Sequence, residues 1–282
     1  MGLLQGATEL FPVSSLGHAV LIPSLLHWAF KQSDPSFVPF LTLLHLGTAG
    51  ALLVIYRDQW IAIIRGFFGA ALRGRIRTEP ERLSMLLMVG TLPTATVGVY
   101  LEHQVKVLFA TPRIAASFLI VNGFLMLGAE LLRRRSERRA AVAGTARSEQ
   151  EEHFGDAEHI SFRAAALVGA CQSLALIPGI SRSGVTIAGG LLAGLRHVEA
   201  ARFSFLLATP VILAAGVLEV PQLFTRGVPI GEYLAGAVLA GIAAYLSARF
   251  LLRYFRSGRL DPYGMYCIAA GVASLALLTL RA

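Results

Sequence analysis

Six long apolar stretches constrain the fold of this chain more than any other feature. They occupy residues 38–56, 83–101, 114–132, 203–220, 233–251 and 264–280. Each is close to the roughly 20 residues that an α-helix needs to cross the hydrocarbon core of a bilayer. The composition agrees, because 55% of the 282 residues are hydrophobic and only 15% are charged, fewer than in an ordinary soluble domain. The sequence therefore predicts an all-α, multi-pass membrane protein with six transmembrane helices.

Two further apolar stretches are interrupted halfway along. Residues 1–30 are broken at "FPVSSLGH", and residues 165–195 are broken at "IPGISRSG". Each half has about a dozen residues, which is too few to cross a bilayer. The open backbone at such a break is tolerated only inside the protein or beside a watery cavity. We therefore expect each stretch to form a re-entrant helical hairpin.

The order of these elements is a hairpin and three spans, followed by a polar linker and the same series again. Local similarity supports a duplication, since "FLTLLHLGTAGALLV" in the first half has a counterpart in "FSFLLATPVILAAGV" in the second. Because three spans is an odd number, the second copy enters the membrane in the opposite orientation. We expect a first repeat at 1–132, a linker at 133–163 and an inverted second repeat at 164–282.

Arginines gather in three connections between the spans. Six lie in 57–82, seven in 133–163 and four in 249–259. In the six-span arrangement these segments lie on one side of the membrane, which the positive-inside rule assigns to the cytoplasm. The net charge of +8 is therefore explained by topology, and we expect no nucleic-acid partner. The linker is charged and poor in large apolar residues, which predicts a flexible cytoplasmic connector.

The N-terminus and the cysteines suggest neither processing nor an additional site. The first thirty residues lack the positively charged start of a secretory signal peptide, so we expect them to remain in the mature protein. Cys171 and Cys267 lie far apart in apolar segments, where they are expected to be packing residues.

The two hairpins carry polar residues that a membrane interior rarely accepts without a function. These residues are Gln5, Glu9, Ser14, Ser15 and His18 in the first hairpin and Ser181, Arg182, Ser183 and Thr186 in the second. Gln5 and Glu9 are four residues apart, so they share a helix face and can reach one ligand or cation. Ser15 and His18 suit a nucleophile and its base. Arg182 offers a planar cationic fork for phosphate oxygens, to which the nearby hydroxyls and helix start add donors, so the hairpins predict an anion-binding site.

Other polar residues of the spans have simpler explanations. His45, inside the first span, is expected to be a hydrogen-bonded interior residue outside the site, and Asn122 is expected to bond between helices. Four residues lie at span ends, where solvation at the interface explains them: Glu102, His103, Glu130 and Glu219. Arg182 and Glu9 differ from all of these because each lies within a broken hairpin, which favours function.

The two broken segments resemble the signature segments of a known family. "QGATELFPVSSLGH" and "GACQSLALIPGISRSGVTIAGGLLAG" are similar to those of the bacterial undecaprenyl pyrophosphate phosphatases, which are linked to bacitracin resistance. The resemblance implies hydrolysis of the terminal phosphate of undecaprenyl pyrophosphate, which releases the monophosphate carrier of peptidoglycan synthesis. It also implies a divalent cation, Mg²⁺ or Ca²⁺, and a place in the bacterial inner (plasma) membrane. Both a monomer and a homo-oligomer are compatible with the sequence.

The resemblance also implies a role for each polar residue of the hairpins. Glu9 and Gln5 correspond to the metal-binding pair, and Arg182 corresponds to the pyrophosphate-binding arginine. Ser15 or a water molecule attacks the phosphate, while His18 acts as general base or stabilises a phospho-enzyme. Substrate binding is expected from Gln5, Ser14, Ser181, Arg182, Ser183 and Thr186.

Two alternatives from other classes fit parts of the pattern. Inverted repeats with broken helices are also typical of membrane transporters, so a transporter or lipid flippase with an anion site at its midplane is the main alternative. A different lipid phosphatase family has a "PSGH" motif that "SSLGH" faintly resembles. That family requires a histidine where this chain has Gly189, so we disfavour it.

Overall fold

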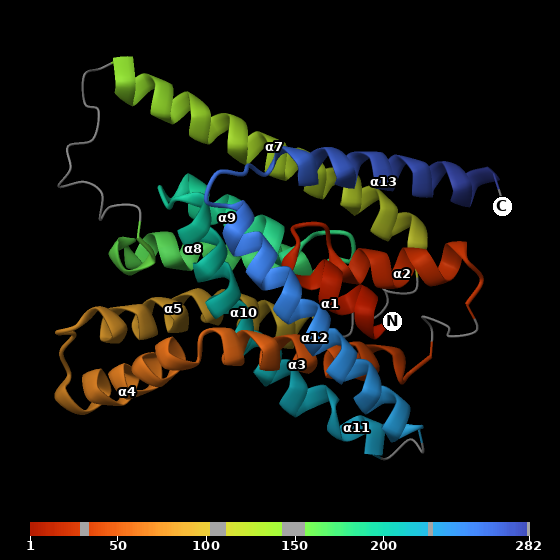
Figure 1. The fold of residues 1–282 in the computed structure, drawn as a ribbon, viewed down its shortest axis with the longest axis horizontal. Coiled ribbons are helices and arrows are strands. Elements are labelled where there is room, and N and C mark those ends of the chain that lie inside the picture. Colours follow the sequence, from red (N-terminus) through yellow and green to blue (C-terminus); the bar gives the residue numbers. More distant parts are fainter. Residues whose placement is uncertain (29–33, 102–110, 143–155, 225–227, 281–282) are drawn as a thin grey trace.

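The computed structural model describes residues 1–28, 34–101, 111–142, 156–224 and 228–280, which form helices and turns without any strand (Figure 1). Within them, six helices are long and apolar enough to cross a membrane. They are α3 (Phe37–Ile55), α5 (Glu79–Tyr100), α7 (Pro112–Val142), α10 (His197–Glu219), α12 (Ile230–Tyr254) and α13 (Asp261–Leu280). Each coincides with one predicted stretch, although several begin earlier, so the prediction of an all-α membrane protein with six spans is confirmed.

Both interrupted stretches form a pair of short helices. The first pair is α1 (Gly2–Leu10) and α2 (Ser15–Leu25), and the second is α8 (Phe162–Ser173), with the 3₁₀ turn η3 (Leu174–Leu176), and α9 (Arg182–Leu192). The breaks fall at the predicted places. The pairs are compatible with re-entrant hairpins, and their depth in the bilayer stays a prediction.

The second helix of each hairpin begins in the same way. The Ser14 hydroxyl accepts a hydrogen bond from the Gly17 amide, and the Ser181 hydroxyl accepts one from the Gly184 amide, each at 3.1 Å. Serine is a preferred N-cap because its side chain satisfies an amide that the first helical turn leaves unpaired. The two hairpins therefore share a capping bond from a serine to the amide three residues later, although φ is 68° at Ser14 and -85° at Ser181.

The two halves of the chain interlock through their hairpins. Helix α1 packs against α12 of the second half, and α8 packs against α5 of the first half. The α5–α8 crossing needs glycine, because a Cβ on Gly169 would lie 1.9 Å from the Gly90 carbonyl oxygen. Close approach at small residues is typical of helix packing in membranes. This exchange is what a twofold-related duplication produces, while the repeat boundaries stay a prediction.

The spans differ in how deeply they lie in the molecule. In α3 and α10, 56% of the most apolar window is buried, compared with 22% in α13. These two helices are corresponding elements of the two halves and pack against each other. Helices α7 and α13 run side by side along another edge (Figure 1). The inner pair, α3 and α10, therefore forms the walls around the hairpins.

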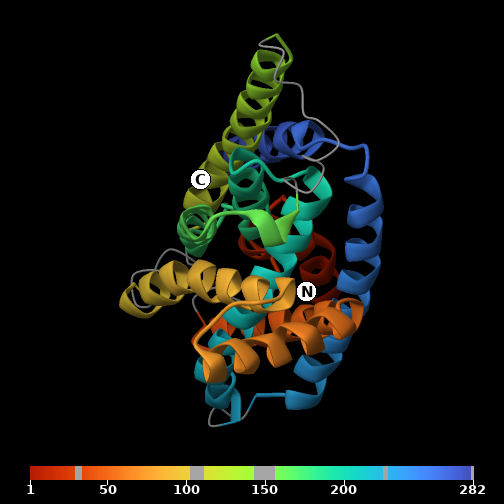
Figure 2. The ribbon, with the colours of Figure 1, turned by 90° about the vertical axis from the view of Figure 1, so that its left-hand side faces the viewer.

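Two segments that the sequence analysis treated as connections are helical. Helix α4 (Arg57–Arg73) follows α3 directly, and α7 continues to Val142, so that its C-terminal end projects beyond the other helices (Figure 2). Pairs such as Glu130 with Arg133, one turn apart, favour this extension of α7, as does the high helix propensity of arginine and alanine. The flexible connector predicted for 133–163 is therefore wrong for its first ten residues, while 143–155 lie outside the described residues. Two short elements complete the fold, η2 (Ala157–His159) and α11 (Pro221–Phe224).

Candidate functional site

A cavity of about 310 Å³ lies where the two hairpin breaks meet α3, α5 and α10. Its polar residues are Glu9, Ser15, Thr42, His45, Thr91, Thr94, Gln172, Ser181, Arg182 and Glu219. Much of the remaining lining is apolar and includes Val38, Leu41, Ala95, Val99, Val211, Ile212, Ala215 and Leu218. The hairpin cavity, as we call it, thus combines a charged end with apolar walls, which suits a ligand with an anionic head and an apolar tail.

Glu9 is the centre of the charged end. Its Oε2 accepts hydrogen bonds from Gln5 Nε2 at 2.8 Å and from the Ser15 hydroxyl, and its Oε1 forms an ion pair with Arg182 Nη2. Only 4% of Glu9 is exposed, and a carboxylate so buried is costly unless it is paired. Four of the predicted site residues from the two hairpins are therefore brought together on one carboxylate.

His45 of α3 is a fifth residue at this carboxylate. Its Nδ1 donates to the Leu41 carbonyl at 2.7 Å, and its Nε2 lies 3.1 Å from Glu9 Oε2. The ring donates from both nitrogens when it is protonated on both. The expectation that His45 lies outside the site was wrong, because it lines the cavity and touches Glu9. The signal that could have identified it is an ionisable side chain in the middle of a span.

Two serines tie the hairpins together near the cavity. The Ser14 hydroxyl donates to the Ile180 carbonyl at 3.2 Å, and the Ser183 hydroxyl donates to the Phe11 carbonyl at 3.1 Å. Each serine thus reaches from one hairpin to the break of the other. These bonds satisfy carbonyls that a broken helix leaves open. They hold the two breaks in register.

Asn122 of α7 connects the same two breaks from outside. Its Oδ1 accepts from the Ser181 amide at 3.0 Å, and its Nδ2 donates to the Pro12 carbonyl at 3.4 Å. The side chain is fully buried. The prediction that Asn122 bonds between helices is confirmed.

The hydroxyls predicted to bind phosphate have structural partners here. Thr186 donates to the Arg182 carbonyl at 2.7 Å and also contacts the Ser204 hydroxyl of α10. Of the second-hairpin hydroxyls, Ser181 lines the hairpin cavity, whereas Ser183 and Thr186 are not among its lining residues. Their roles in substrate binding stay predictions.

His18 lies apart from the carboxylate. Its Nδ1 donates to the Ser14 carbonyl at 2.7 Å, and its Nε2 lies 2.8 Å from the hydroxyl of Tyr266 on α13. Since a carbonyl can only accept, Nδ1 carries a proton, and a neutral ring would use its Nε2 lone pair to accept from Tyr266. The described contacts therefore place His18 against α13 instead of at Glu9, and its predicted role as general base stays a prediction.

Gln172 and Thr94 are cavity residues that the sequence analysis missed. Thr94 donates its hydroxyl proton to the Gly169 carbonyl at 2.9 Å, so it must accept from Gln172 Nε2, which lies 3.2 Å away. This arrangement fixes the orientation of the Gln172 amide and leaves its Oε1 buried without a hydrogen bond in the described part of the chain. Gln5 Oε1 and Arg182 Nη1 are likewise buried without a hydrogen bond to any described residue. Buried polar atoms nearly always find a partner, so these three indicate unused bonding capacity for a ligand.

The oxygen atoms near Glu9 fit a hard divalent cation. Gln5 Oε1 is a buried acceptor that has no partner among the described residues. Glu9 Oε1 is paired with Arg182, which has phosphate oxygens as alternative partners. Among the residues that the structure describes, no group of three His, Cys, Asp or Glu side chains is placed to hold a metal. One carboxylate and one amide oxygen match Mg²⁺, which keeps several waters and takes further ligands from substrate phosphates.

Comparisons with known proteins find relatives along nearly the whole chain. The family model for bacitracin resistance protein BacA matches residues 1–273. An undecaprenyl-diphosphatase of Mycolicibacterium paratuberculosis is 46% identical over all of this chain and 96% of its own length. One from Acidiphilium cryptum is 46% identical over 98% of this chain and 95% of its own length, and undecaprenyl-diphosphatase 1 of Burkholderia pseudomallei is 47% identical over 98% and 94%.

The contact between His45 and Glu9 predicts a positioning role for the imidazole. His45→Leu should lower kcat about tenfold to a hundredfold with little change in KM, because a hydrogen bond to a charged group contributes roughly 1.5–3 kcal/mol. His45→Gln, which keeps an N–H donor, should recover most of the loss. Steady-state phosphate release by both variants, with thermal unfolding as the control for folding, measures this. Equal defects in the two variants would mean that only the ring's packing matters.

Proposed function

The chain belongs to the bacitracin resistance protein BacA family, and on that premise we propose that it is an undecaprenyl-diphosphatase. The reaction hydrolyses undecaprenyl pyrophosphate to undecaprenyl phosphate and inorganic phosphate. The product is the lipid carrier of peptidoglycan synthesis, which links the activity to cell-wall formation and to bacitracin resistance. Six apolar helices make the chain a multi-pass membrane protein, and we assign it to the bacterial inner (plasma) membrane because its substrate is a lipid of cell-wall assembly.

One observation carries this proposal: Arg182 of one hairpin and Glu9 and Ser15 of the other meet at the charged end of a cavity with apolar walls. A diphosphate matches the arginine, and a prenyl chain matches the walls from α3, α5 and α10. A water-soluble phosphate ester would leave those walls without a partner.

Arg182 is the residue that holds the diphosphate in this mechanism. Its guanidinium forms paired hydrogen bonds with phosphate oxygens, and its Nη1 has no partner among the described residues. Phosphoryl transfer depends mainly on positioning and on charge stabilisation. When Arg182 turns to the phosphate, its ion pair with Glu9 Oε1 breaks. Substrate binding therefore frees this oxygen to bind a cation.

We assign Ser15 as the group that attacks the terminal phosphorus. Its Oγ would form the new P–O bond while the bond from that phosphorus to the bridging oxygen breaks, and undecaprenyl phosphate leaves. Since Ser15 donates a hydrogen bond to Glu9, the carboxylate can take the proton, and His45 and Gln5 hold that carboxylate in place. After that proton has passed to the leaving phosphate or to solvent, Glu9 takes a proton from water, which attacks the phosphoserine. The P–Oγ bond breaks, which releases inorganic phosphate and restores Ser15. Direct attack by water at the same position is the alternative.

A divalent cation would be held by Glu9 and Gln5. Bound there, Mg²⁺ or Ca²⁺ supplies positive charge that stabilises the phosphoryl group in transfer. Gln5 Oε1, buried and unpartnered among the described residues, supports this assignment.

Loss of either charge at the hairpin contact should nearly abolish the reaction. We expect Arg182→Ala and Glu9→Ala to lower phosphate release at least about a hundredfold, the usual effect of removing a group that stabilises the transition state. Purified protein with undecaprenyl pyrophosphate in detergent, with liberated phosphate as the readout, is the assay. The same preparations in proteoliposomes test the transporter alternative, which requires lipid movement without phosphate release. Substantial phosphate release by Arg182→Ala would overturn the assignment.

The nucleophile can be identified by trapping. If Ser15 attacks, rapid acid quenching during turnover should yield phosphoserine at position 15, and Ser15→Ala should lose at least about a hundredfold in kcat, as expected for a covalent nucleophile. Mass spectrometry of the quenched protein detects the adduct. Incorporation of labelled water oxygen into phosphate without any adduct, together with an active Ser15→Ala, would establish direct attack by water.

Gln5 should set the cation requirement. Chelation should stop phosphate release and Mg²⁺ should restore it. Gln5→Glu adds a carboxylate and should lower the half-saturating Mg²⁺ concentration about tenfold, whereas Gln5→Leu should raise it, because hard cations prefer charged oxygen ligands. Magnesium titrations of the variants measure this. Full activity after chelation would rule out the cation.

A further inference from the structure

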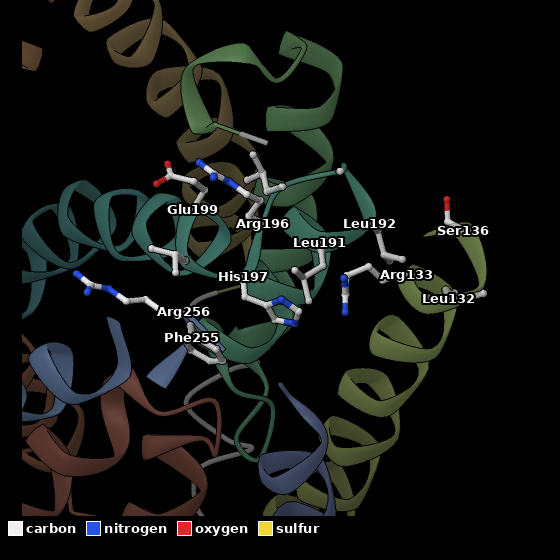
Figure 3. A pocket seen from close by; sticks show the side chains of 13 residues that line it. Leu132, Arg133, Ser136, Leu191, Leu192, Arg196, His197, Glu199, Phe255 and Arg256 are labelled. Atoms are coloured by element: carbon white, nitrogen blue, oxygen red, sulfur yellow. The ribbon is translucent and has the colours of Figure 1, made fainter. Parts of the chain in front are cut away.

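A second cavity lies between α7, α9, α10 and the C-terminal end of α12 (Figure 3). Its volume is about 500 Å³, and it shares no lining residue with the hairpin cavity. It is found at the end of the molecule where the arginines of 133–139 and 249–259 gather. The positive-inside rule assigns this end to the cytoplasmic side. We call it the basic cavity.

Cationic side chains predominate among the charged residues of the basic cavity. Arg133, Arg196 and Arg256 line it together with His197, and Glu199 is the acidic member. Arg196 is paired with Asp156, at 2.5 Å. Glu199 is engaged by Arg202, whose Nη1 donates to it at 2.8 Å. Arg133 extends from α7 toward His197 at the start of α10 (Figure 3). The cavity therefore presents cationic groups from different helices.

Glu130 holds two of these groups in place. Its Oε1 accepts from Arg133 Nη2 at 3.0 Å and from Arg134 Nε at 3.2 Å, and its Oε2 lies 2.8 Å from His197 Nε2. The expectation that Glu130 is solvated at the interface was wrong, because it is fully buried. A buried carboxylate with several donors fixes those donors. Arg133 and His197 are thus positioned before any ligand arrives.

The rest of the lining is largely apolar. It includes Leu132, Leu191, Leu192, Leu195, Val198 and Phe255. Leu132 and Leu192 are 52% and 55% exposed, so the apolar part of the cavity continues onto the surface. A free anion would use only the cationic groups. Cationic groups beside an apolar surface instead match a phosphate carried on an apolar stem, and basic pockets between membrane helices on the cytoplasmic side are suited to lipid head groups.

We propose that the basic cavity binds the phosphate head group of an anionic phospholipid from the adjacent leaflet. Arg133 and His197 contact the phosphate, and Arg256, which is exposed and directed away from them in Figure 3, reaches it by a change of rotamer. Leu132 and Leu192 contact the first carbons of the acyl chains. The bound lipid contacts α7, α10 and the end of α12 at the same time, and so stabilises the packing between the two halves of the chain. This site is separate from the phosphatase chemistry and does not depend on it.

Thermal unfolding of the purified full chain in detergent tests the proposal. Short-chain phosphatidylglycerol should raise the Tm in a saturable manner, and phosphatidylcholine with the same chains should not. Arg256→Gln should require about tenfold more phosphatidylglycerol for half of the effect, as expected for loss of one charged contact. Arg253→Gln is the matched control, because it removes the same charge from the same helix end and does not line the cavity. It should behave as the unmodified protein does.

A second variant tests the shape of the cavity separately from its charge. Leu192→Trp fills the cavity mouth and removes no charge, so it should weaken the effect of phosphatidylglycerol at least as much as Arg256→Gln does. Phosphate release should be unchanged in all three variants, which establishes that they fold. The proposal is overturned if Arg253→Gln and Arg256→Gln lose the effect equally, or if phosphatidylcholine gives the same Tm shift. It is also overturned if inorganic phosphate alone reproduces the shift, which would indicate a free-anion site.

Discussion

The ion pair between Glu9 and Arg182 is the interaction on which the arrangement of the hairpins depends. Neither hairpin can bury its charge alone, because an unpaired ionised side chain in a membrane interior costs several kcal/mol. Each hairpin therefore needs the other. The surrounding hydrogen bonds stabilise this contact. The hydroxyls of Ser14 and Ser183 each donate to the break of the other hairpin, and Asn122 of α7 bonds to both breaks.

The second helix of each hairpin begins after an N-cap serine, but the first residue of that helix differs between the two hairpins. Ser15 and Arg182 are each the first residue of the second hairpin helix, directly after an N-cap serine. One position therefore carries a hydroxyl in the first hairpin and a guanidinium in the second. Both positions lie at one cavity, and in the proposed mechanism the difference between them supplies a nucleophile on one side and an anion-binding group on the other.

Many polar side chains near the site hold the backbone rather than face the cavity. A broken helix leaves amides and carbonyls open, and in a membrane interior these must be satisfied by the protein. The hydroxyls of Ser183 and Thr186 donate to backbone carbonyls in this way. Among the described residues of the hairpins, those with a buried polar atom that lacks a hydrogen bond are instead Gln5, Gln172 and Arg182. Fewer side chains are therefore available to a ligand than the polar composition of the hairpins suggests.

The sequence by itself determined the six spans, the two breaks and the identity of the charges within them. These features are local, because the length of an apolar run and the cost of a buried charge can be read from consecutive residues. Tertiary structure decided which side chains meet. His45 reaches Glu9 while His18 turns to Tyr266, and Glu130 is buried among arginines instead of solvated. These outcomes depend on how helices distant in the chain are rotated and packed against one another. Hydrogen bonds tolerate only a few tenths of an ångström, and residue spacing within one segment carries no such information about another.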